Sequence, residues 1–173
     1  QSYVNGCKGM IFGGVDVRVL KGSALCYATA TRGCDHLRGG LLVELPTRDG
    51  KPAMDPAMAL ERFGTTDALS PASYNKAYAA GYAQDSYTIA DCLEVCKFVT
   101  DHNGQGVDLQ DMADMLQAVT GEPFSVEELR LIAHRVFTLE RAFLVREGIS
   151  RKDDVLTGKW TRGPVSGGRF QGF

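Results

Sequence analysis

The sequence predicts an all-α fold built mainly of helices. Two long segments, residues 108–121 and 125–148, repeat apolar residues at the spacing of one buried helix face. Helix start and stop signals flank both segments, whereas only the stretch 9–20 has a composition that leans toward β-strands. Four or more helices against one doubtful strand region favour a single helical domain over residues 1–173.

The elements before these two helices are less regular. Residues 22–33, "GSALCYATATRG", are small and helix-compatible, which predicts a helix packed closely against a neighbour or a ligand. Residues 44–56 carry proline, glycine and aspartate at turn spacing and are predicted to form a loop. Ser70 followed by Pro71 predicts the start of a helix, and a helical rhythm continues through residues 88–99, "TIADCLEVCKFV".

Capping residues set the expected bounds of the last two helices. Asp108 is the expected N-cap and Gly121 the expected stop of the first. Ser125 and Glu128 form the capping-box pattern that opens the second, which is expected to run to Gly148. The remaining residues are polar, glycine-rich and irregular.

Composition limits the class of protein. The 173 residues are 44% hydrophobic and 23% charged, which is typical of a globular domain with a real core. A formal net charge of -2 gives no basic footprint for nucleic acid, and no apolar run is long enough to span a membrane. Five cysteines, an odd number without a secretory signal, favour a reducing cytoplasm with free thiols or a metal site.

The two ends of the chain suggest a portion of a longer protein. The start, "QSYVNGCKG", has neither a methionine nor the plan of a signal peptide. The end, "SGGRFQGF", has the composition of a loop. We therefore expect further parts of the same chain on both sides.

Asp91 and Cys96 interrupt an apolar helical rhythm in which core packing needs neither a carboxylate nor a thiol. Either they lie on a solvated face of the helix or they bind another chemical group. Cys92 and Cys96 would share one helical face, and Cys34 precedes His36 by two residues, so a zinc site is a weak alternative. No C-x-x-C pair or paired histidines support zinc, and taken by itself His36 is more often a half-exposed loop residue.

Residues 101–112, "DHNGQGVDLQDM", resemble a calcium-binding EF-hand loop in their first half. The twelfth position, where such a loop needs a bidentate glutamate, is Met112. Without that ligand we favour a turn followed by a helix cap and reject calcium.

Three blocks follow one another between residues 8 and 154: "KGMIFGGVDVRVLKGSALCYATATRGCDHLRGG", "DCLEVCKF" and "REGISRKDD". In this order they resemble the later part of the tungsten-containing aldehyde:ferredoxin oxidoreductase family. That family has matching Lys-Gly, Asp-x-Arg, Tyr-Ala-Thr and His-Leu-Arg patterns, and an Asp-x-x-Gly-Leu-Cys-like motif. The resemblance implies most of a helical C-terminal domain, in which residues 20–40 and 88–98 face the cofactor.

The resemblance also implies cofactors and residue roles. In that family two pterins hold tungsten or molybdenum beside a 4Fe-4S cluster. Asp91 would accept hydrogen bonds from a pterin, Val95 would offer its backbone beside it, and Cys96 would be a cluster ligand. His36 would orient substrate or pass a proton near the metal. The implied reaction oxidises a small aldehyde to a carboxylate, and electrons pass through the cluster to ferredoxin or another carrier.

Departures from the family pattern keep other hypotheses open. Glu94 stands where the motif has glycine, and the C-x-x-C-x-x-x-C run that supplies the other three cluster ligands does not occur here. The chain alone is therefore not expected to hold the cluster or to catalyse a reaction. One alternative is a cofactor-free helical scaffold or binding subunit with the family fold. Another is a family member that acts on another substrate, such as an aromatic coenzyme A thioester.

Overall fold

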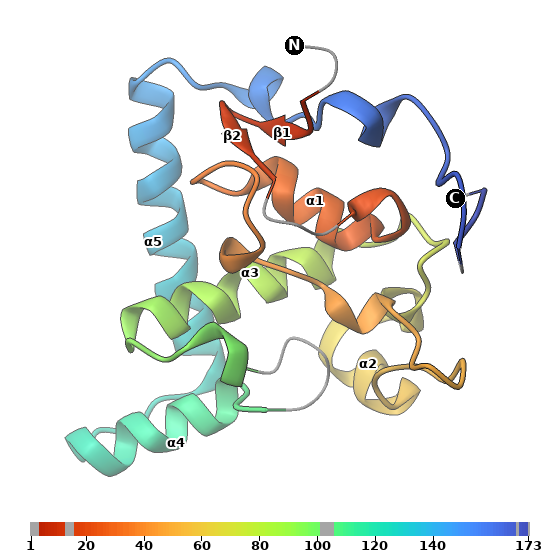
Figure 1. Cartoon of the computed structure of the whole chain (residues 1–173). Helices are drawn as coiled ribbons and strands as arrows, with labels where there is room; N and C mark the ends of the chain where they lie inside the picture. The colour runs from red at the N-terminus through yellow and green to blue at the C-terminus, as the bar shows by residue number, and fades with distance from the viewer. Residues whose placement is uncertain (1–3, 13–15, 101–105, 169, 173) are drawn as a thin grey trace.

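The computed structural model describes residues 4–12, 16–100, 106–168 and 170–172 (Figure 1). Within these residues the fold is mainly helical, as predicted. The α-helices are α1 (Lys21–Thr29), α2 (Pro56–Phe63), α3 (Ala77–Cys92), α4 (Leu109–Thr120) and α5 (Val126–Arg146). The strands β1 (Gly6–Cys7) and β2 (Met10–Ile11) form one antiparallel hairpin, and short 3-10 turns connect much of the rest.

Helix α3 lies at the centre of the molecule, and all the other α-helices contact it. The long helix α5 packs against α3 and extends from α4 to the β-hairpin, where the C-terminal segment turns back across the top of the view (Figure 1). One apolar cluster joins the C-terminal half of α3 to α4 and α5. A second joins α2 and the segment 41–43 to the start of α3, and a third lies under α1 and the hairpin.

The two predicted capping patterns are confirmed. Asp108 accepts hydrogen bonds from the N–H groups of Gln110 and Asp111, and α4 ends at Gly121 with a φ of 80°. Ser125 and Glu128 form both hydrogen bonds of a capping box at the start of α5. Local sequence signals therefore predict where α4 begins and ends and where α5 begins.

The predicted start of α3 at Ser70 and Pro71 is wrong. The helix begins at Ala77 because the Lys76 ammonium, which is buried, donates hydrogen bonds to the carbonyls of Asp67, Ala68 and Ser70 and holds that stretch in a turn. Pro71 is compatible with a turn as well as with a helix start.

Helix α2 was not predicted. It begins where Asp55 accepts a hydrogen bond from the Ala57 N–H, with Pro56 in the first turn, and it ends at Gly64, whose φ is 69°. These start and stop residues can be read from the sequence, but the prolines and glycine just before them led to the prediction of a loop over residues 44–56. In the β-leaning stretch 9–20, the described residues 9–12 and 16–20 form β2 and the short 3-10 turn Val17–Val19 but no longer strand.

Two further sequence expectations concern the segment after α3. The first five positions of the rejected calcium loop, which include His102, lie outside the described residues. Asp108 is the cap of α4, and Met112 is fully buried in the core. Among the described helices, none has the combination of length and apolar character that crossing a membrane requires.

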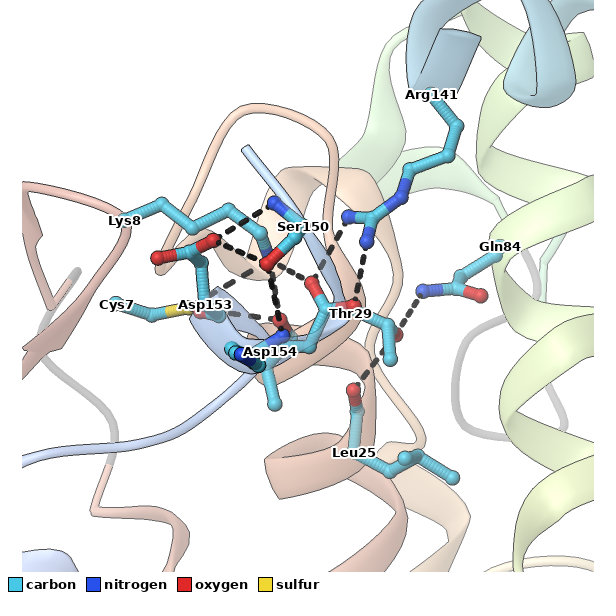
Figure 2. A network of polar contacts seen from close by, with 11 residues as sticks. Cys7, Lys8, Leu25, Thr29, Gln84, Arg141, Ser150, Asp153 and Asp154 are labelled. Atoms are coloured by element: carbon cyan, nitrogen blue, oxygen red, sulfur yellow. Dashed lines mark hydrogen bonds and ion pairs between the residues drawn. The ribbon is translucent and has the colours of Figure 1, made fainter. Parts of the chain in front are cut away.

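A polar network fastens the hairpin to the C-terminal segment (Figure 2). The side chain of Lys8, in the hairpin turn, is 3% exposed, and its ammonium lies 2.6 Å from Asp154 Oδ1. Arg141 of α5 binds the same carboxylate through both terminal nitrogens, at 2.9 and 2.8 Å. Burial by itself would raise the pKa of Asp154, but hydrogen bonds from Lys8 and Arg141 lower it below its ordinary value.

Candidate functional site

The C-terminal end of α3 forms a tight backbone reversal. The N–H of Val95 donates to the Ala90 carbonyl at 2.8 Å, and the N–H of Glu94 donates to the Asp91 carbonyl at 3.2 Å. This pair of bonds defines a Schellman motif, which requires a residue in the left-handed conformation. Glu94 fills that place with a φ of 58°. The resembled motif has glycine at this position, so the backbone shape expected of a glycine is kept although the side chain differs.

This reversal corrects one prediction. Helix α3 ends at Cys92, and Cys96 lies beyond the reversal, immediately before the short 3-10 turn Lys97–Val99. Cys92 and Cys96 therefore do not share a helical face. The helical rhythm of residues 88–99 was misleading because no glycine marks the end of the helix.

Two cations contact the carboxylate of Asp91. The Lys97 ammonium lies 2.6 Å from Oδ1, and Arg38 Nη1 lies 3.1 Å from Oδ2. Arg38 also lies 3.2 Å from Glu140 of α5. The Asp91 side chain remains 44% exposed, so it can still accept hydrogen bonds from a molecule that docks on this face.

Lys97 connects this carboxylate to the interior. Its ammonium donates to the Tyr87 carbonyl in α3, and only 10% of its side chain is exposed. Burial lowers the pKa of Lys97, and the hydrogen bond and charge of Asp91 oppose that shift. The lysine therefore fixes the segment after the reversal against α3.

The cysteines fall into two groups. Cys92 and Cys96 are exposed, whereas Cys7, Cys26 and Cys34 are buried. Burial raises the pKa of Cys34 to about 12, so this thiol keeps its proton at neutral pH. Within the described residues no three histidine, cysteine, aspartate or glutamate side chains are close enough to form a candidate metal site.

His36 begins the short turn His36–Arg38, for which Asp35 accepts a hydrogen bond from the Leu37 N–H. The half-buried imidazole lines a partly enclosed pocket between α1, α3 and the turn Lys97–Val99. Lys97 lines the same pocket, which therefore lies next to the side chain that binds Asp91.

The site combines residues that the sequence indicated with residues that it did not. His36, Asp91, Val95 and Cys96 were singled out, and they lie in two adjoining segments that Arg38 joins through its ion pair with Asp91. Arg38 and Lys97 were not assigned a role, although each belongs to a quoted block. Their pairing with Asp91 was the missing information, and for Arg38 the separation is 53 residues.

Comparison with known proteins identifies the family of the chain. The family described as "Aldehyde ferredoxin oxidoreductase, domains 2 & 3" matches residues 1–172. The chain belongs to this family.

Proteins named "Tungsten-containing aldehyde ferredoxin oxidoreductase" are among its relatives. The one from Thermococcus kodakarensis is 30% identical over 159 residues, which cover 91% of this chain and 23% of the relative. The one from Pyrococcus abyssi is 30% identical over 172 residues, covering 98% of this chain and 25% of the relative. The chain thus spans about a quarter of the length of these relatives.

Proposed function

We propose that this chain forms the cofactor-facing helical domain of a tungsten (or molybdenum) bispterin oxidoreductase. The whole enzyme would oxidise a small aldehyde to a carboxylate and pass electrons through a 4Fe-4S cluster to ferredoxin or another carrier in the cytoplasm. The observation that carries the proposal is the reversal after α3. It leaves Asp91 and Cys96 exposed on either side of a residue held in a glycine-like conformation.

The residues at the reversal fit a pterin. An ionised carboxylate accepts hydrogen bonds only, and the ring of a pterin presents N–H donors. Lys97 and Arg38 contact one oxygen of Asp91 each, which leaves further acceptor sites on a carboxylate that is 44% exposed. The Val95 N–H is already bonded to Ala90, so only the Val95 carbonyl is proposed to face the pterin.

Cys96 fits one ligand position of an iron–sulfur cluster. Its thiol is exposed, and it lies five residues after the proposed pterin ligand, so the two groups would bind neighbouring centres. The other three thiolates must come from residues other than those of this chain, which lacks the required cysteine run. When bound, the metal and the cluster supply the redox chemistry.

His36 is the candidate for proton transfer or substrate orientation. Its half-buried ring lies in the pocket that also contains Lys97. Imidazole can donate or accept a proton near neutral pH, which suits the release of protons during oxidation of an aldehyde.

The second candidate function is a cofactor-free scaffold with the family fold. The observation that favours it is Glu94, whose side chain projects from a position where the family motif has none. A family member acting on an aromatic coenzyme A thioester would use the same cofactor residues and differ in its substrate site.

The deciding experiment is metal and pterin analysis of the complete enzyme that contains this chain. Tungsten or molybdenum, released pterin and about four irons per cluster are expected. A sample without metal or pterin would favour the scaffold.

Cys96→Ala tests the ligand assignment in the same preparation. We expect loss of cluster iron, because a ligating thiolate is removed. Cys92→Ala is the matched control, since Cys92 is also exposed but precedes the reversal, and it should retain iron. Full iron content in Cys96→Ala would refute the assignment.

A further inference from the structure

Glu94 occupies a backbone position that disfavours any residue but glycine. Among the described non-glycine residues only Lys8 and Glu94 have a positive φ. Lys8 is held by its buried ion pair with Asp154, whereas the exposed side chain of Glu94 has no hydrogen bond or ion pair with the described residues. Non-glycine residues in this conformation cluster at functional sites, where the strain is retained for function. A glutamate that is strained and makes no stabilising contact therefore indicates a role other than stability.

The cations near the reversal are already paired with Asp91. The Lys97 ammonium lies 2.6 Å from Asp91 Oδ1, and Arg38 Nη1 lies 3.1 Å from Oδ2. Arg38 also pairs with Glu140 at 3.2 Å. The charge of Asp91 is thus compensated. Glu94 adds one formal negative charge that no cation of the described residues contacts.

The backbone keeps Glu94 close to Cys96. The N–H of Glu94 donates to the Asp91 carbonyl at 3.2 Å, and the N–H of Val99 donates to the Cys96 carbonyl at 3.1 Å, so the chain is fixed on both sides of this pair. Consecutive Cα atoms are about 3.8 Å apart, so the Cα atoms of Glu94 and Cys96 are separated by at most about 7.6 Å. Both side chains are exposed. A group bound to the Cys96 thiol would therefore lie near the Glu94 carboxylate.

A negative charge near an iron–sulfur cluster affects its reduction potential. Reduction by one electron makes the cluster more negative, and a neighbouring carboxylate opposes that change. Three of the four thiolates must come from residues outside this chain, so the face around Cys96 would be covered in the complete enzyme. Charges are screened less where water is excluded, so the effect of Glu94 would be larger there than on an open surface.

We propose that Glu94 lowers the reduction potential of the cluster that Cys96 binds, by placing an uncompensated negative charge beside it. The inference rests on the proposed function, because it requires the cluster. It gives Glu94 a role in electron transfer, since a cluster of lower potential passes its electron more readily to the carrier. It also explains why a charged residue stands where glycine would supply the same backbone shape without a charge.

The midpoint potential of the cluster in the complete enzyme tests this inference, measured by redox titration followed by EPR. Glu94→Gln removes the charge and keeps the length of the side chain, so the fold should be unchanged. We expect a shift to more positive potential. Its size should correspond to an increase on the order of tenfold in the equilibrium constant for reduction, as for two charges roughly 10 Å apart at an effective dielectric constant of about 20. An unchanged midpoint potential with wild-type iron content would overturn the inference.

Glu94→Asp is the conservative variant. It keeps the negative charge at nearly the same place, so its midpoint potential should stay close to that of the wild type. If Glu94→Asp raised the potential as much as Glu94→Gln does, the shape of the side chain and not its charge would be responsible, and the inference would fail.

Glu61→Gln is the matched control for the loss of one negative charge. Glu61 is exposed in α2, which packs against the start of α3, whereas Glu94 follows the end of that helix. The 16 residues of α3 correspond to a length of about 24 Å, so Glu61→Gln should leave the midpoint potential unchanged. Equal shifts in Glu61→Gln and Glu94→Gln would show an effect of net charge, and would contradict a specific role of Glu94.

The outcomes separate this inference from the proposed function. A complete enzyme without iron would contradict both, and the metal and pterin analysis would reveal that before any redox titration. A complete enzyme with a full cluster whose potential does not respond to Glu94→Gln would contradict only this inference, and Cys96 would remain the proposed cluster ligand.

Discussion

Glu94 has a backbone conformation that glycine adopts at far lower cost. Its φ of 58° lies in the left-handed region, where a Cβ costs roughly 1–2 kcal/mol. Glycine avoids this cost, but part of the gain is lost because glycine gives the unfolded chain more conformational entropy. We expect Glu94→Gly to stabilise the fold by about 0.5–1 kcal/mol and to raise Tm by a few degrees.

Glu94→Ala is the control for this prediction, measured by the same thermal and urea unfolding. Alanine removes the charge and keeps the Cβ, so it should give little of the gain. An equal gain in both variants would show that charge, not backbone conformation, limits the stability of this reversal.

His36 should affect turnover without affecting metal content. Its half-buried ring lies in the pocket and has no described contact with Asp91 or Cys96. In the complete enzyme, His36→Ala is expected to lower kcat about a hundredfold, the usual size of a general acid–base contribution, with tungsten and iron retained. Full activity with retained metal would remove His36 from the mechanism.

At the scale of elements, the Lys8–Asp154–Arg141 network joins the hairpin, α5 and the segment after it. The pKa of Asp154 is lower in the folded chain than its ordinary value, so the ionised carboxylate stabilises the fold above that ordinary value. This stabilisation should be lost as the pH falls through the lowered pKa. Asp154→Asn leaves Lys8 and Arg141 without their shared carboxylate, and about 3 kcal/mol of stability should be lost at neutral pH.

Urea unfolding of both proteins from neutral to strongly acidic pH checks this prediction. The difference in unfolding free energy between wild type and Asp154→Asn should be largest near neutral pH and should shrink in acid, where Asp154 is protonated. A difference that stays constant with pH would show that packing rather than charge accounts for the effect.

The elements also show which parts of the fold were predictable. The caps of α4 and α5 involve residues within three positions of one another, so the sequence contains the whole signal. The start of α3 depends on Lys76 reaching back to the stretch 67–70, and the contact between Arg38 and Asp91 bridges 53 residues. Asp91 and Cys96 could be chosen from a motif, whereas the contact between Asp91 and Arg38 required tertiary structure.

At the scale of the molecule, the accessible thiols limit what the 173-residue chain can bind. A cubane cluster needs four thiolate ligands. Cys92 and Cys96 are exposed, whereas Cys7, Cys26 and Cys34 are 3%, 0% and 0% exposed. Lys8 Nζ lies 3.6 Å from Cys7 Sγ, but burial outweighs it and raises the pKa of Cys7, so this thiol too favours its protonated form.

Reconstitution of this chain alone with iron and sulfide under anaerobic conditions should therefore give no stoichiometric 4Fe-4S cluster. The measurement is iron and sulfide content together with the visible absorption of the cluster, compared between the wild-type chain and Cys96→Ala. Because two exposed thiols cannot replace four ligands, both proteins should contain equally little iron. A full cluster that disappears in Cys96→Ala would mean that buried cysteines rearrange to complete the site, and the need for thiolates from elsewhere in a longer enzyme would no longer hold.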